Sequence, residues 1–131
     1  MIHRTLQPAG WASPRGYSNG VEAQGRMVFV AGQIGWNPVS CAFETDDFVG
    51  QVDQALRNVV AVLREAGAGP EHVTRMTWYI TDRAAYAENT RSVGRVYRDA
   101  FGPHYPAMTL VIVAGLLEEE ARVEIEATAV V

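Results

Sequence analysis

The stretch HYPAMTLVIVAGLLEEEARVEIEATAVV, residues 104–131, determines how this chain folds. It contains two strand-like runs, residues 107–113 and 122–130, which are joined by an acidic turn. The first run is apolar at every position except Thr109, so both of its faces need to be covered. The second run alternates, with Val, Ile and Ala on one face and Arg, Glu and Thr on the other. A carboxylate on that polar face, such as Glu124, is solvated, paired or functional.

The composition fits one domain, residues 1–131. The chain is 48% hydrophobic, which is enough for a core, and its net charge of −4 provides no basic surface for nucleic acid. No apolar stretch approaches the roughly 20 residues that span a bilayer. We therefore expect a cytoplasmic protein with no nucleic-acid and no membrane partner. The single Cys41 cannot form an internal disulfide, and we interpret it as structural rather than as a reactive thiol.

Two strands are predicted upstream, at residues 17–23 and 26–34. They are expected to pair around Gln24 and Gly25, because Gly25 can adopt the positive φ that a hairpin demands. Residues 1–15 contribute at most a short edge strand. Residues 27–31 are apolar throughout, which again predicts burial of both faces, and Gly32 marks a bulge or a close backbone approach.

Two amphipathic helices and a strand fill the middle of the chain. Apolar residues from Phe48 to Leu63 recur at helical spacing, with an N-cap at residues 45–47 and a stop at Gly67. Residues 73–80 alternate as a strand. A second helix is predicted over residues 84–100 and ends before Gly102 and Pro103.

The resulting order is β-β-α-β-α-β-β, an α+β fold with a mainly antiparallel sheet and two helices on one face. Those helices leave the other face of the sheet bare. Because two strands have no polar face, we expect copies of the chain to cover it, with sites for small molecules between subunits.

Four segments carry a resemblance to a known family: YSNGV at residues 17–21, VAGQI at 30–34, YPA at 105–107 and VEIEATAV at 123–130. Together they resemble the Rid family, also called the YjgF or L-PSP endoribonuclease-like family. The resemblance implies a chorismate-mutase-like fold, a homotrimer and a ligand cleft at each subunit boundary. It also implies hydrolysis of reactive enamines and imines derived from amino acids.

Three family positions are changed here. In deaminases of the family an arginine directly after the PA dipeptide clamps the substrate carboxylate, and here that position is Met108. The position two further on, often Cys, is Leu110, and a common substrate-binding asparagine corresponds to Gly94. Met108 and Leu110 either fill the old site as core residues or shape a new one.

Other family positions are retained. Glu124 matches the glutamate that orients the attacking water, Tyr17 matches a tyrosine of the cleft, and Gly32 matches a glycine whose backbone approaches the ligand. Two of them also have a structural interpretation: Tyr17 can pack at an interface, and Glu124 can pair with Arg122, with Arg75 or with a neighbouring copy of the chain.

His104 and Arg95 are further candidates for the site. Histidine can serve as an acid or base near neutral pH, which makes His104 a candidate, although loop histidines more often hydrogen-bond the backbone. Arg95, next to Gly94, is the best candidate to restore an anion contact from another direction. No spacing of His, Cys, Asp and Glu resembles a metal site, and no cofactor motif is present.

Three functional hypotheses remain open. The first is a hydrolase of imine- or enamine-type metabolites with altered substrate choice, for example a substrate without a free α-carboxylate. The second is a non-catalytic binding or regulatory trimer that uses the same cleft. The third is a ribonuclease, which the acidic composition disfavours.

Overall fold

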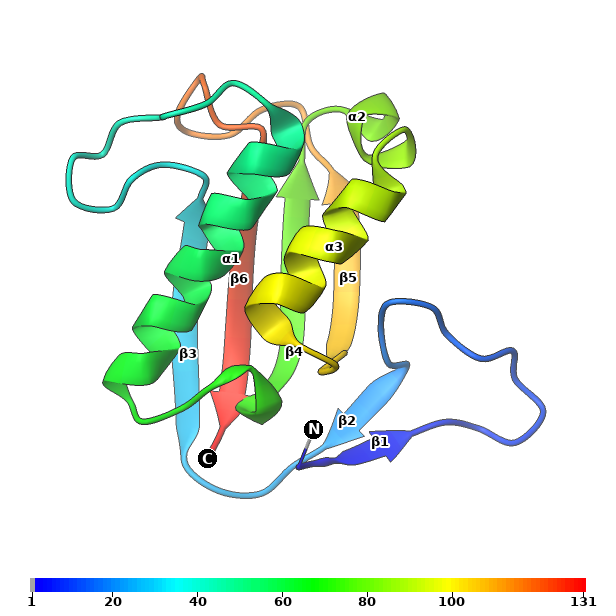
Figure 1. Ribbon diagram of the computed structural model, residues 1–131. Coiled ribbons are helices and arrows are strands. Elements are labelled where there is room, and N and C mark those ends of the chain that lie inside the picture. The colour runs from blue at the N-terminus through cyan, green and yellow to red at the C-terminus, as the bar shows by residue number, and fades with distance from the viewer. Residues whose placement is uncertain (1) are drawn as a thin grey trace.

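The computed structural model describes residues 2–131, and its centre is a four-stranded sheet. The strands are Met27–Ile34 (β3), Val123–Val130 (β6), Val73–Ile80 (β4) and Ala107–Ile112 (β5), in the spatial order β3-β6-β4-β5. β6 is antiparallel to both of its neighbours, whereas β4 and β5 are parallel. The last strand along the chain therefore lies in the middle of the sheet (Figure 1).

Two helices, Phe48–Glu65 (α1) and Thr90–Phe101 (α3), cover one face of this sheet (Figure 1). Val123 and Ile125 of β6 are fully buried in the same core as Leu56 of α1. On the opposite face, Met27 and Phe29 are 57% and 71% exposed. The α+β fold with helices on one face is confirmed, and within a single chain the other face is bare.

The first helix begins and ends where the sequence predicts. The Asp47 side chain accepts a hydrogen bond of 2.9 Å from the backbone N–H of Gly50, which caps the N-terminus. Gly67 has φ of 69° just after the helix. A Cβ at Gly35 would lie 2.5 Å from Cβ of Gln51, so α1 packs directly against the chain at the end of β3.

The predicted second helix is two helices, Arg83–Ala87 (α2) and α3. The prediction of one continuous helix over residues 84–100 is wrong, because the chain breaks at Glu88 and Asn89. The Asn89 side chain donates to the carbonyl oxygen of Ala85 at 2.7 Å. Side-chain bonds of this kind offer the backbone an alternative to the helical ladder. A single 3₁₀ turn, Pro70–His72 (η1), precedes β4.

The predicted hairpin between residues 17–23 and 26–34 is also wrong. Gly20–Glu22 (β2) pairs instead with Arg4–Leu6 (β1) in a separate two-stranded sheet. Arg26 exchanges backbone hydrogen bonds with Val131. A Cβ at Gly25 would lie 2.5 Å from the carbonyl oxygen of Val131, so this glycine permits a close crossing of two chain segments rather than a hairpin turn.

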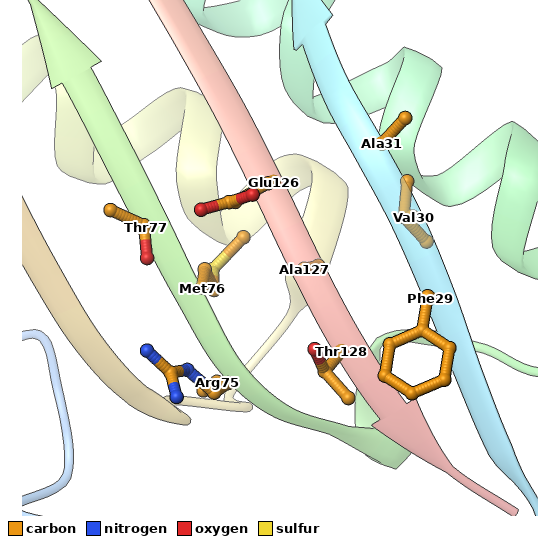
Figure 2. Close-up of a pocket in the computed structure, with 9 residues that line it drawn as sticks. All are labelled: Phe29, Val30, Ala31, Arg75, Met76, Thr77, Glu126, Ala127 and Thr128. Carbon is orange, nitrogen blue, oxygen red and sulfur yellow. The ribbon is translucent and has the colours of Figure 1, made fainter.

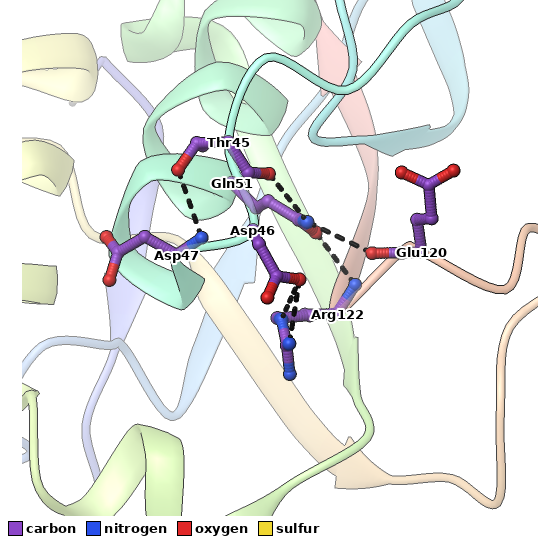
Figure 3. Close-up of polar contacts among 6 residues, drawn as sticks. All are labelled: Thr45, Asp46, Asp47, Gln51, Glu120 and Arg122. Carbon is purple, nitrogen blue, oxygen red and sulfur yellow. Dashed lines mark hydrogen bonds and ion pairs between the residues drawn. The ribbon is translucent and has the colours of Figure 1, made fainter.

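A buried amide on α1 fixes the start of β6 (Figure 3). Gln51 is fully buried; its Nε2 donates to the carbonyls of Thr45 and Glu120, and its Oε1 accepts from the N–H of Arg122 at 2.8 Å. At the surface, Arg122 pairs with Asp46 at 2.8 Å. This network anchors the backbone two residues before Glu124.

None of the helices within residues 2–131 is long and apolar enough to cross a membrane.

Candidate active site

Glu124 lies on the bare face of the sheet, in a gap that Gly32 creates. The pairing of β3 with β6 shifts register between Val30 and Gln33, which confirms the irregularity predicted at Gly32. A Cβ at Gly32 would lie 2.7 Å from Oε2 of Glu124 and 2.8 Å from its carboxyl carbon. Any larger residue at this position would displace the carboxylate, so the two residues act as a pair.

The Glu124 side chain is half-buried and has no hydrogen-bond or ion-pair partner within residues 2–131. Arg122, one of its expected partners, pairs with Asp46 instead. The neighbouring carboxylate differs, because Glu126 accepts a 2.6 Å hydrogen bond from the hydroxyl of Tyr79. That bond raises the pKa of Tyr79. Of these two carboxylates on β6, Glu124 is therefore the one without a partner in the described residues, whereas Glu126 is the one that lines a hollow on this face.

A hollow of about 480 Å³ lies beside Glu126 on the same face (Figure 2). Phe29, Arg75 and Thr128 contribute to its lining from three adjacent strands. In a single chain this hollow is open on one side, where another copy of the chain could cover it.

Tyr17 lies beside the YPA segment. The N–H of Ser18 donates to the carbonyl of Pro106 at 3.0 Å, and the Ser18 hydroxyl donates to the carbonyl of Tyr105. Tyr17 is 39% exposed and lines a hollow of about 400 Å³ together with Met108. Two motifs that are about 90 residues apart in sequence therefore meet at the edge of the sheet.

Met108 and Leu110 lie on the helix-covered face of β5. Met108 pairs in register with buried Met76, and Leu110 pairs with buried Trp78. Glu124 pairs with Tyr79, which points to the opposite face. Within one chain, therefore, Met108 and Glu124 do not converge, and a site that uses both needs two copies.

A cavity of about 420 Å³ lies between α3 and the strands β4 and β5. Gly94 and Met108 both line it, which brings these two predicted positions together. Arg95 is exposed and does not line the cavity, whereas Arg98 and Arg15 do. The helical spacing from Gly94 to Arg98 signals that Arg98 shares its side of α3; Arg15 carried no such signal in the sequence.

The surroundings of His104 indicate a structural role. Its Nδ1 atom is buried and has no hydrogen-bond partner within residues 2–131, and its carbonyl oxygen accepts from the hydroxyl of Tyr97. Burial lowers the pKa of His104 and raises the pKa of Tyr97. The imidazole lines none of the three cavities described above.

A comparison with known protein families assigns the chain to one of them. Residues 9–131 match the family model described as Endoribonuclease L-PSP. The chain belongs to the Rid (YjgF, L-PSP endoribonuclease-like) family. This membership agrees with the chorismate-mutase-like α+β fold, and it confirms the resemblance carried by the four sequence motifs.

Three Rid relatives illustrate the similarity. The Rid protein YyfB from Yersinia pestis is 31% identical, with 100% of both chains covered and a TM-score of 0.88. E. coli TdcF, whose crystal structure has bound serine, is 32% identical, with 100% of this chain and 98% of TdcF covered and a TM-score of 0.69. The human 2-iminobutanoate/2-iminopropanoate deaminase is 30% identical over 105 residues, 80% of this chain and 73% of the human protein.

This Rid-family chain combines a free carboxylate on the bare face with an apolar residue at the arginine position. A carboxylate with unused acceptor sites can hold and deprotonate a water molecule. Within residues 2–131, no group of three or more His, Cys, Asp or Glu side chains is arranged to hold a metal ion.

Proposed function

We propose that this protein hydrolyses small imine- or enamine-type metabolites at a cleft between the subunits of a homotrimer. The observation that carries the proposal is the unpaired carboxylate of Glu124, held half-buried in the gap that Gly32 leaves. The reaction class is supported by the name of the human relative, an imine deaminase.

In the proposed reaction Glu124 holds a water molecule against the imine carbon. The imine enters protonated on nitrogen by solvent, as an iminium ion. The carboxylate takes a proton from the water as the water oxygen bonds to the imine carbon, and the π electrons of the C=N bond move to nitrogen. The carboxyl group then returns its proton to that nitrogen, and the carbinolamine collapses to a carbonyl compound and ammonia, with its hydroxyl proton released to solvent. An enamine enters the same path once its β-carbon has been protonated.

The geometry supports a cyclic assembly. Met108 lies on β5, one edge strand of the sheet, whereas Gly32 lies on β3, the other edge strand. A contact that brings one edge of a copy against the opposite edge of the next is heterologous, and such a contact forms a ring when its rotation closes. The exposed side chains of Met27 and Phe29 provide apolar area for such a contact.

The substitution at position 108 supports an altered substrate choice. A thioether has no charge and cannot form the bidentate pair that a guanidinium forms with a carboxylate. Leu110 and Gly94 remove two further polar or reactive groups from the same region. The proposal is therefore a Rid-type hydrolase whose substrate differs from those of the arginine-containing deaminases.

The test is the Glu124→Gln variant, assayed on a panel of imines generated in situ, with ammonia release as the readout. We expect a loss of at least about 100-fold in kcat, as is typical when a general base is removed. Glu119→Gln, an exposed turn residue, is the matched control and retains activity. Full activity of Glu124→Gln, or a monomeric mass by light scattering, would refute the proposal.

The second candidate is a non-catalytic binding or regulatory trimer, which the absence of arginine at position 108 favours. It predicts that the wild-type protein binds a ligand in the cleft without turnover on any imine of the panel. In that case Glu124→Gln changes the affinity for the ligand, and there is no rate of hydrolysis for it to change.

A further inference from the structure

The cavity under α3 has an aromatic wall. Tyr97 and Tyr105 stack with ring centroids 5.2 Å apart and an interplanar angle of 19°, and Trp78 lies 6.5 Å from Tyr97. All three residues line the cavity, together with the thioether of Met108. Its volume of about 420 Å³ falls in the usual range for small-molecule sites, about 300–1,000 Å³. Such a wall suits a flat, apolar group.

The charged side chains that line this cavity are both positive. Arg15 reaches it from the N-terminal segment and Arg98 from the last turn of α3, and within residues 2–131 no carboxylate side chain lines it. Neither arginine forms an ion pair with another described residue. By contrast, the hollow on the bare face contains both Arg75 and Glu126. The cavity under α3 therefore favours an anion.

Arg98 folds back over Gly94. A Cβ at Gly94 would lie 3.4 Å from Nη1 of Arg98, an ordinary contact, so the guanidinium lies against the uncovered backbone one helical turn earlier. A glycine inside a helix costs about 1 kcal/mol relative to alanine. At position 94 it leaves space beside a guanidinium that lines the cavity.

We propose that this cavity binds an aromatic carboxylate, with the carboxylate at Arg98 and Arg15 and the ring against Tyr97 and Tyr105. The carboxylate contact of this chain is thus supplied from α3 and the N-terminal segment, while Met108 extends the apolar wall. The inference rests on the proposed function and deepens it: the substrate class is the imine of an aromatic α-amino acid. Because Glu124 of the same chain lies on the opposite face of the sheet, the carboxylate that acts on this substrate comes from a neighbouring copy. A substrate without a free carboxylate, which Met108 alone suggested, does not use these two arginines.

The experiment measures binding of three stable probes to the assembled protein by isothermal titration calorimetry. The probes are 3-phenylpropanoate, its neutral amide and propanoate, which separate the charge from the ring. We expect 3-phenylpropanoate to bind at least about tenfold more tightly than either of the others, because both a charged hydrogen bond and ring burial contribute. Equal binding of the acid and the amide would overturn the proposal.

Two arginines on the same helix provide matched variants. Arg98→Ala is expected to weaken binding of 3-phenylpropanoate at least about tenfold, whereas Arg95→Ala, an exposed neighbour outside the cavity, leaves it unchanged. Arg98→Lys retains a charge without the planar fork and is expected to recover part of the affinity. If Arg95→Ala weakens binding as much as Arg98→Ala does, general surface charge explains the result and the site is refuted.

The two proposals fail separately. Selective binding that depends on Arg98, without hydrolysis of any imine, refutes the hydrolase and leaves this site in place. Hydrolysis that depends on Glu124 but shows no preference for aromatic imines, and no effect of Arg98→Ala, refutes this site and leaves the hydrolase.

Discussion

Substitution of Gly32 by alanine tests the link between the fold and the proposed chemistry. The new Cβ would lie 2.7, 2.8 and 2.9 Å from Oε2, the carboxyl carbon and Cγ of Glu124, where ordinary contacts begin at 3.4 Å. The carboxylate must therefore move by about 0.5–0.7 Å or turn to another rotamer. A misplacement of about 1 Å in an active site can cost about 100-fold in rate, so we expect kcat to fall about 10- to 100-fold.

The expected effect of Gly32→Ala on stability is small. Relief of the clash by a distorted Glu124 side chain costs about 0.5–1.5 kcal/mol, which corresponds to roughly 2–6 °C in Tm for a domain of this size. Ammonia release and thermal unfolding, measured on the same preparations, separate the two effects. Gly115→Ala is the control, because a Cβ at Gly115 would meet no atom within 4 Å.

A double-mutant cycle of Gly32→Ala and Glu124→Ala tests whether Gly32→Ala acts by displacing the carboxylate. If alanine at position 32 acts by displacing the carboxylate, it should cost little in stability or rate once Glu124 is already alanine. An equal loss of kcat in the wild-type and Glu124→Ala backgrounds would refute this reasoning, as would full activity of Gly32→Ala alone.

Two further predictions concern buried polar groups. Gln51→Leu removes three hydrogen bonds at the start of β6 and should lower the free energy of unfolding by about 2–4 kcal/mol in urea titrations, whereas Gln24→Leu, exposed in a loop, should change it little. Because burial lowers the pKa of His104 in the folded protein, the imidazole binds a proton more readily in the unfolded chain than in the folded one. The folded protein is therefore most stable with respect to this group above about pH 6.5, and it loses stability as the pH falls below that value. The Tm of the wild type should therefore fall more steeply from pH 7.5 to 5.5 than that of His104→Gln, with His3→Gln as control, and equal slopes would contradict the assignment.

The sequence predicts the local parts of this fold well. The stripe and caps of α1, the alternation along β6 and the irregularity at Gly32 all depend on neighbouring residues, and the structure confirms each. The hairpin around Gly25 was wrong because a positive φ is compatible both with a turn and with a close crossing, and the partner that decides between them, Val131, lies over 100 residues away.

The candidate site was predictable where it rests on motifs and not where it rests on tertiary contacts. Glu124 and Tyr17 were proposed as site residues because they lie in recognisable segments. Arg98 was missed because Arg95 was chosen for being next to Gly94 in sequence, whereas the residue four positions on, Arg98, is the one that shares the side of Gly94 on a helix. Arg15 was missed because its segment has no periodicity, so only the folded chain brings it to α3.

The central position of β6 imposes an order on biosynthesis. Its two neighbours, β3 and β4, have no hydrogen bonds to each other and are joined only through this last strand. On the ribosome, β3 and β4 consequently remain without this shared partner until residues 123–130 have left the exit tunnel. During that interval the nascent chain exposes unpaired strand edges, which is the condition under which chaperones bind and aggregation competes with folding.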